Sequence, residues 1–150
     1  IRCREVGHAF LGNSDMHPPD SVQLRRITYD ASGGEEMFLS FEDAEQDLLI
    51  GYLRLRIPGE AAHRPEITGQ TAGIVRELHV FGQTVPVGGR LEGAFQHQGY
   101  GTRLLQEAER VASEEYGRKK MVVISALGTK LYYARFGYKH DGPYVSKLLC

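Results

Sequence analysis

The chain has 150 residues, 41% of them hydrophobic and 25% charged, with a formal net charge of -1. This composition is typical of a soluble globular protein with a single domain. The balanced charge excludes a whole-domain basic field for nucleic acid, and no apolar run is long enough to span a membrane.

The cysteines and histidines predict neither disulfide bonds nor a bound metal ion. Cys3 and Cys150 stand far apart, which predicts neither a disulfide framework nor a metal site, and the histidines form no HxxxH or HxH spacing. A reducing intracellular location is therefore expected. The chain begins at Ile1 within the segment IRCREVG, so we expect a fragment of a longer protein.

The first part of the chain predicts an antiparallel meander. Strands are expected at residues 23–30, 37–41 and 48–57. Gly33 and Gly34 mark the first turn, and the acidic segment 43–47 marks the second. In the third strand, apolar residues alternate with Arg54 and Arg56, which indicates one packed face and one basic face.

A strand and a long helix are expected next. Polar, glycine-rich loops are predicted at 58–73 and 82–95, on either side of a strand at 74–80. Residues 102–116 predict an amphipathic helix, because apolar residues recur at helical spacing. These residues are Leu104, Leu105, Ala108, Val111 and Ala112. Gly117 suits the left-handed position that ends a helix.

The last segment predicts one strand, one short helix and a closing hairpin. The strand is expected at 121–125, after a basic turn at 118–120, and the helix at 130–136. Thr129 is expected to cap this helix and Gly137 to end it. The closing strands are expected at 138–140 and 144–149.

The glycines before the long helix are the first functional signal. Gln96-x-x-Gly99-x-Gly101 precedes a helix whose first backbone N–H groups have no partner within the helix. Small residues let an anion reach these donors, and the helix end adds a partial positive charge worth about 0.3–1 kcal/mol per anion. The pattern predicts a diphosphate-binding loop; the alternative is a glycine-rich turn that only starts a helix.

The order of these segments resembles the GNAT acetyltransferase superfamily. A strand, a glycine loop, a helix, a second strand and LYYARFGY at 131–138 follow one another as in its core. The resemblance implies an α/β GNAT fold with a mixed, mostly antiparallel sheet flanked by helices. It also implies that the pyrophosphate of acetyl-CoA is bound, mostly through backbone N–H groups, by Gln96, His97, Gln98, Gly99, Tyr100, Gly101 and Thr102. Arg103 is either a phosphate contact or a solvated charge.

Longer segments resemble the C-terminal acetyltransferase domain of the Elongator catalytic subunit family. The most specific are FLSFED at 38–43, RELHV at 76–80 and FQHQGYG at 95–101, and the likeness covers nearly the whole chain. It implies that residues 1–150 are one GNAT domain of a tRNA wobble-uridine carboxymethylation enzyme. The resemblance also implies a radical-SAM domain with S-adenosylmethionine and a 4Fe–4S cluster N-terminal to Ile1. No CxxxCxxC occurs in this chain, so that domain is expected to lie outside it.

The same resemblance assigns roles to the strand at 74–80. Glu77, Leu78, His79 and Val80 form its end, which diverges from the next strand in GNAT folds and pairs with the pantetheine arm. A backbone N–H in the segment from Leu78 to Val80 would polarise the thioester carbonyl. Alternation places Leu78 and Val80 on one face and Glu77 and His79 on the other. Glu77 and His79 are candidate catalytic groups; the alternative is that both only make structural hydrogen bonds.

Tyr133 and Tyr132 are the expected proton donors. Tyr133 lies four residues before Gly137, where GNAT enzymes often carry a tyrosine that protonates the leaving CoA thiolate. A thiol pKa of about 8.5 and a phenol pKa of about 10 make this transfer feasible once the thiolate is desolvated. Tyr132 would substitute for Tyr133 or stack on the cofactor. The alternative is that one of the pair is a core aromatic residue.

The implied function is cleavage of acetyl-CoA to supply the acetyl group, with tRNA and other Elongator subunits as partners in the cytoplasm or a eukaryotic nucleus. Protein or histone lysine acetylation is an alternative, although Ile74 stands where histone-type enzymes often place a general-base glutamate. A third hypothesis is a module that binds acetyl-CoA without turnover. A basic tRNA surface would draw on Arg2, Arg4, Arg25, Arg26, Arg54, Arg56, Lys119 and Lys120, although such residues are usually solvated.

Overall fold

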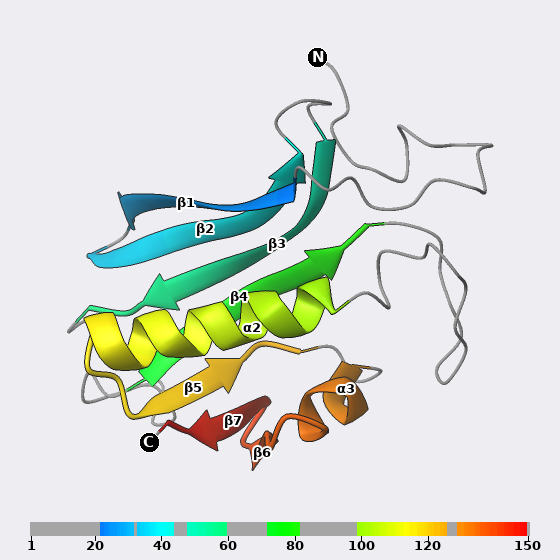
Figure 1. The fold of residues 1–150 in the computed structure, drawn as a ribbon. Helices are drawn as coiled ribbons and strands as arrows, with labels where there is room; N and C mark the ends of the chain where they lie inside the picture. Colours follow the sequence, from blue (N-terminus) through cyan, green and yellow to red (C-terminus); the bar gives the residue numbers. More distant parts are fainter. Residues whose placement is uncertain are drawn as a thin grey trace.

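The computed structural model describes residues 22–31, 33–43, 48–59, 72–81, 99–125 and 129–149. They form one seven-stranded sheet, and the long helix α2 lies across one of its faces (Figure 1). The strands are β1 (Val22–Ala31), β2 (Gly34–Asp43), β3 (Leu48–Ile57), β4 (Ala72–Val80), β5 (Lys120–Val123), β6 (Lys139–Asp141) and β7 (Tyr144–Leu148). The helices are α2 (Tyr100–Arg110), which continues into a π-helical turn at Val111–Glu115, and α3 (Lys130–Ala134). Within the described ranges, none of the helices has the length and apolar character needed to traverse a bilayer.

The sheet confirms the predicted class and the predicted meander. The strand order is β1-β2-β3-β4-β5-β7-β6, and every neighbouring pair is antiparallel except β4 and β5. The first two strands of the meander are longer than expected, whereas β3 has the predicted bounds. β2 starts at Gly34, directly after Gly33, whose φ is 76°. Asp43, expected in a turn, is instead the buried last residue of β2.

The strands β4 and β5 both start earlier than the sequence predicts, and close packing accounts for the first of these differences. Ala72 and Gly73, expected in a loop, are the buried first residues of β4. A Cβ at Gly73 would lie 3.2 Å from the Cβ of Ala112, so the absence of a side chain lets the helix approach the sheet here. Lys120, expected in a turn, likewise starts β5 and pairs with Ala72.

Helix α2 is held on the sheet by its apolar stripe. It begins at Tyr100 rather than at residue 102, so Tyr100 and Gly101 belong to its first turn. The predicted stripe is confirmed, since each of its members is at most 1% exposed. It shares one buried cluster with sheet residues that include Leu39, Leu53 and Val75. Burial of a large aliphatic side chain contributes about 1.5–3 kcal/mol, so this contact is the main force that positions α2.

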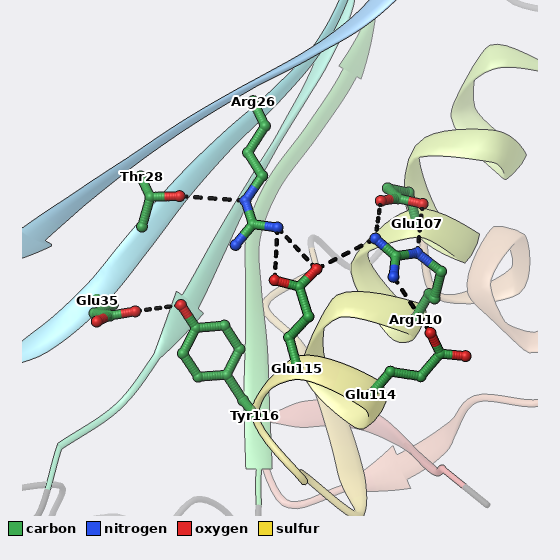
Figure 2. Close-up of polar contacts among 8 residues, drawn as sticks. All are labelled: Arg26, Thr28, Glu35, Glu107, Arg110, Glu114, Glu115 and Tyr116. Carbon is green, nitrogen blue, oxygen red and sulfur yellow. Dashed lines mark hydrogen bonds and ion pairs between the residues drawn. The ribbon is translucent and has the colours of Figure 1, made fainter.

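At its C-terminal end the helix contacts β1 through an ion pair and β2 through a hydrogen bond (Figure 2). Nη1 of Arg26 lies 2.8 Å from both carboxylate oxygens of Glu115, and Arg110 reaches the same carboxylate at 3.3 Å. The hydroxyl of Tyr116 donates to Glu35 of β2. Exposed ion pairs contribute only about 0–1 kcal/mol each, so these contacts orient the helix end more than they stabilise it.

A buried carboxylate organises the sheet face turned away from α2. Glu36 is 3% exposed; its Oε2 accepts hydrogen bonds from Tyr29 at 2.9 Å and from Arg54 at 3.4 Å. Its Oε1 accepts a hydrogen bond from Arg76 and lies 3.5 Å from Arg56. The predicted basic face of β3 therefore exists, but its arginines converge on an acid within the sheet.

The pKa of Glu36 predicts acid-sensitive stability. Burial alone would raise this pKa, but hydrogen bonds from Tyr29, Arg76 and Arg54 lower it from 4.5 to about 2. Because the folded value lies below the unfolded one, the stabilisation is complete above about pH 4.5 and is lost as the pH falls towards 2. Glu36→Gln should cost about 1–3 kcal/mol at pH 7 and flatten this pH dependence.

Urea denaturation at a series of pH values from 2 to 7 measures both effects. Glu114→Gln is the matched control, because its carboxylate is 66% exposed on the helix surface. A Glu36→Gln variant with the wild-type free energy of unfolding and the wild-type pH slope would show that the carboxylate does not hold this face together.

Candidate functional site

The candidate site lies where β4 separates from β5. The parallel ladder joins Ala72–Val75 to Lys120–Val123, and one further bond runs from the N–H of Ile124 to the carbonyl of Val75 at 3.0 Å. Beyond this point β4 continues to Val80 paired with β3 alone among the described strands. The start of α2 lies beside the end of β4 (Figure 1), and the region where β4 has no pairing to β5 is called the opening. The divergence that the GNAT resemblance implies is thus present.

A β-bulge accounts for the divergence. Arg54 of β3 pairs with Glu77 and Leu55 pairs with Val75, so Arg76 is an extra residue in β4. A bulge bends its strand and increases the local twist, which turns β4 away from β5 just after their last pair. The Arg76 side chain is held by Glu36 on the face away from α2. No residue type is diagnostic of a bulge, so the sequence patterns do not reveal the role of Arg76.

The first turn of α2 faces this opening. Gly99 precedes it with a φ of 81°, and its carbonyl accepts the first helical bond, from Arg103 N–H at 2.9 Å. The N–H groups of Tyr100, Gly101 and Thr102 are first-turn donors without a partner within the helix. No acidic residue lies in this turn, and a Cβ at Gly99 would meet none of the described residues within 4 Å. The described part of the chain therefore leaves room and donors for an anion here.

Gly101 is the point at which three elements meet. A Cβ at this position would lie 2.7 Å from the hydroxyl oxygen of Tyr132 and 3.5 Å from Cγ2 of Val80. Thus α3, the end of β4 and the start of α2 converge on a residue without a side chain. Thr102 shares a hydrogen bond with the Tyr132 hydroxyl, whose pKa is raised by burial. Of the two expected tyrosines, Tyr132 is the one whose hydroxyl reaches the start of α2.

Tyr133 lies deeper, within an aromatic cluster. It is 6% exposed, and its ring packs edge-on against Tyr132 and Tyr138 at centroid distances of 5.2 and 5.9 Å. Burial, and then the neighbouring Tyr132, raise its pKa to about 12. Full proton transfer to a thiolate with a pKa of about 8.5 would then cost about 5 kcal/mol at equilibrium, so Tyr133 is suited to donate a hydrogen bond.

Helix α3, which carries both tyrosines, lacks the side-chain cap that the sequence predicts at its start. The side chain of Thr129 makes no capping hydrogen bond at α3, because this residue already has helical φ and ψ angles of -104° and -4°. Gly137 follows with a φ of 92°, as expected for a residue that ends a helix.

Glu77 and His79 point away from the helix, as alternation predicts. Leu78 and Val80 pack against the core, whereas Glu77 and His79 are exposed. Glu77 forms an ion pair with Arg54 at 3.3 Å, and the His79 ring stacks on Phe81 at 4.4 Å. Both side chains therefore have structural partners, and a catalytic role requires them to act on the sheet face opposite α2.

Two residues at the start of α2 have side chains that are already engaged. Tyr100 is 7% exposed, and its ring packs against Phe41 at 5.1 Å, so only its backbone N–H can serve a ligand. The Arg103 guanidinium lies 4.5 Å from the Phe41 ring centroid, a cation–π arrangement. Gln96, His97 and Gln98 lie outside the described residues.

The proposed basic tRNA residues do not form one free patch in the described part of the chain. Arg26 pairs with Glu115, Arg54 and Arg56 with Glu36, and Lys120 with Asp141 at 2.5 Å. Arg25 and Lys119 are exposed. Arg2 and Arg4 lie outside the described residues.

Comparisons with known proteins agree with this geometry. The acetyltransferase (GNAT) domain family matches residues 91–147. Elongator complex protein 3 of Schizosaccharomyces pombe is 50% identical over 99% of the chain, and that of Dictyostelium discoideum is 51% identical over 99%. The solved structure of Elp3 from the archaeon Methanocaldococcus infernus, which has an N-terminal deletion, is 47% identical with a TM-score of 0.85, covering 99% of this chain and 35% of that one. The chain spans only 28% and 27% of the two curated relatives.

The contact between Gly101 and Tyr132 predicts a specific steric coupling. Gly101→Ala should destabilise the protein by about 1–3 kcal/mol, because the new methyl group overlaps the Tyr132 hydroxyl. Tyr132→Phe removes that oxygen, so the double variant should recover most of the loss. Urea denaturation of the four proteins measures the coupling as a double-mutant cycle. Strictly additive losses would mean that the two groups do not touch.

Proposed function

We propose that the chain is the GNAT acetyltransferase domain of an Elongator complex protein 3 and that it binds acetyl-CoA in the opening between β4 and β5. The observation that carries the proposal is the end of the β4–β5 ladder near the first turn of α2, whose N–H groups have no partner within the helix. When bound, acetyl-CoA supplies an activated acetyl group.

The residues around the opening fit this ligand. Gly99 leaves space above the first turn of α2, whose N–H groups and positive helix end suit a diphosphate. Gln96, His97 and Gln98 are proposed to complete this loop. The backbone of Glu77, Leu78, His79 and Val80 is proposed to pair with the pantetheine arm as an added strand.

The proposed chemistry uses hydrogen-bond donors from β4 and α3. A backbone N–H in the segment 78–80 polarises the thioester carbonyl, in the manner of an oxyanion hole. Tyr132 or Tyr133 donates a hydrogen bond to the thiol group that leaves. Their raised pKa values keep both phenols protonated at neutral pH, so both remain donors there.

The function of the longer protein is proposed from its relatives. Residues 1–150 act as one domain that supplies acetyl groups for carboxymethylation of the wobble uridine of tRNA. A radical-SAM domain with S-adenosylmethionine and a 4Fe–4S cluster would lie in the remainder of such a protein, together with contacts to other Elongator subunits. The described residues contain no group of three His, Cys, Asp or Glu side chains that could hold a metal ion. The site of action is the cytoplasm or, in a eukaryote, the nucleus.

Lysine acetylation is the second candidate function, and one exposed carboxylate favours it. Glu77 is 48% exposed on the sheet face opposite α2 and is the one acidic residue of β4. A lysine ammonium, with a pKa of about 10.4, must lose a proton before it attacks a thioester. Ile74 is buried and cannot accept this proton, and Glu77 is paired with Arg54, so we rank this function second.

Acetyl-CoA cleavage by the corresponding full-length protein tests the proposal. Release of CoA should accelerate when tRNA is added. Tyr133→Phe should slow this release by about 10²-fold, because it removes a donor at the leaving group, while the affinity for acetyl-CoA changes little. Tyr144→Phe on β7 is the matched control and should keep the wild-type rate.

Other results would contradict parts of the proposed function. Acetylation of histone peptides by the 150-residue chain without tRNA would favour the second function. Calorimetric binding of acetyl-CoA with no CoA release under any condition would leave a binding module without turnover. Wild-type rates in Tyr133→Phe and in a Tyr132→Phe variant would remove both tyrosines from the mechanism.

A further inference from the structure

Strand β1 lies at one edge of the sheet with its residues exposed. Among the described strands it pairs with β2 alone, through a continuous ladder from Val22 to Ala31 (Figure 1). Residues 23–30 are all exposed, among them Ile27 at 61% and Tyr29 at 42%. Proteins usually protect such an edge with proline, lysine or a bulge, because it can pair with another strand. β1 contains neither proline nor lysine, and its ladder has no bulge.

Alternate residues of β1 direct their backbone groups to the outer edge. Two residues join Ala31 to Gly34, so these two residues form the hydrogen-bonded pair that closes the hairpin. Hydrogen-bonded and non-hydrogen-bonded pairs then alternate along the ladder. The N–H and C=O groups of Arg26, Thr28 and Asp30 therefore point away from β2, where a further strand can bind them.

We propose that two copies of this chain pair through β1, antiparallel and with the two-fold axis at Thr28. On the sheet face that carries α2, this arrangement places Arg26 opposite Asp30 of the second copy and Thr28 opposite its own counterpart. On the other face it places Ile27 opposite Tyr29. An opposite-charge pair, a pair of threonines and an aromatic residue beside a β-branched one are the favourable kinds of cross-strand neighbour.

The charges on β1 select this register. An axis at Arg26 would place two guanidinium groups directly opposite each other, which is destabilising. An axis at Ile27 would place Asp30 opposite Leu24 and leave both charges without an opposite charge across the strands. The axis at Thr28 pairs the two charges with each other on both sides of the axis.

Arg26 and Asp30 are already arranged for this contact. Arg26 donates from Nη1 to Glu115 at 2.8 Å and from Nε to Thr28 at 3.2 Å, so its guanidinium is held over the α2 face of β1. Asp30 lies opposite Glu35 in the ladder with β2, and like charges in this position repel. An arginine from a second copy offsets that repulsion.

The pairing does not involve the acetyl-CoA opening. Strands β2 and β3 lie between β1 and β4, so the opening stays uncovered in both copies. The inference therefore stands independently of the proposed function.

Sedimentation equilibrium of the whole 150-residue chain, at concentrations from micromolar to millimolar, measures the association. The mass should rise with concentration from 16.8 kDa towards twice that value. Over the same range, amide hydrogen exchange at Arg26, Thr28 and Asp30 should become slower, because their N–H groups become hydrogen-bonded between the copies.

An exchange of charges tests the register. Asp30→Arg brings a second positive charge opposite Arg26, and Arg26→Glu brings a second negative charge opposite Asp30. Each variant alone should dimerise about 10- to 100-fold more weakly, since two attractive pairs become repulsive. An equimolar mixture of the two variants should dimerise again, because every pair across the axis then has opposite charges.

Arg25→Glu is the matched control. It makes the same charge change on the neighbouring residue, whose side chain lies on the other face and opposite Ala31, so it should keep the wild-type dissociation constant. Asp30→Arg replaces an exposed residue and removes its repulsion with Glu35, so it should retain the wild-type melting temperature. This variant therefore remains informative even if Arg26→Glu, which loses the contact with Glu115, is destabilised.

Three results would overturn the inference. A chain that remains monomeric up to millimolar concentration would leave the edge of β1 to a strand from a different protein or from the rest of a longer one. A dimer that persists in Asp30→Arg would lie on another surface. Failure of the mixed, folded variants to dimerise would contradict the register at Thr28.

Discussion

The bulge at Arg76 is the constraint on which the candidate site depends. A regular strand paired with both β3 and β5 would leave no opening over α2. One extra residue lets β4 keep its ladder with β3 while it turns away from β5. The Arg76 guanidinium binds the buried carboxylate of Glu36, which also binds Tyr29 and Arg54. The charge network on one face of the sheet thus supports the geometry of the opening on the other.

Helix α2 links this opening to the core. Its apolar stripe is buried on the sheet, and ion pairs from its last turns reach β1. These contacts lie away from the first turn, so the N–H groups there can remain available without loss of the helix position.

The adjacent residues Tyr132 and Tyr133 lie in different environments. Tyr132 places its hydroxyl at Gly101 and Thr102, whereas Tyr133 packs its ring between Tyr132 and Tyr138. Burial raises the pKa of Tyr133 to about 12, which favours hydrogen-bond donation over complete proton transfer. Their adjacency in the sequence conceals this difference in environment.

The sequence by itself determined most of the elements and the family resemblance. Alternation in β3 and the apolar stripe of α2 are local periodic patterns, which can be recognised without knowledge of the partner surface. The motifs RELHV and FQHQGYG likewise carry the family resemblance in consecutive residues. The π-helical turn and the start of β4 at Ala72 were not visible in these patterns, because they depend on how closely the helix approaches the sheet.

Only the tertiary structure decided how the site is assembled. Val80, Gly101 and Tyr132 belong to three separate elements, and no periodicity in the chain relates them. The bulge at Arg76 and the convergence of the arginines on Glu36 depend on the register between strands. Register and packing arise from contacts between distant segments, whereas a sequence pattern reports only what neighbouring residues have in common.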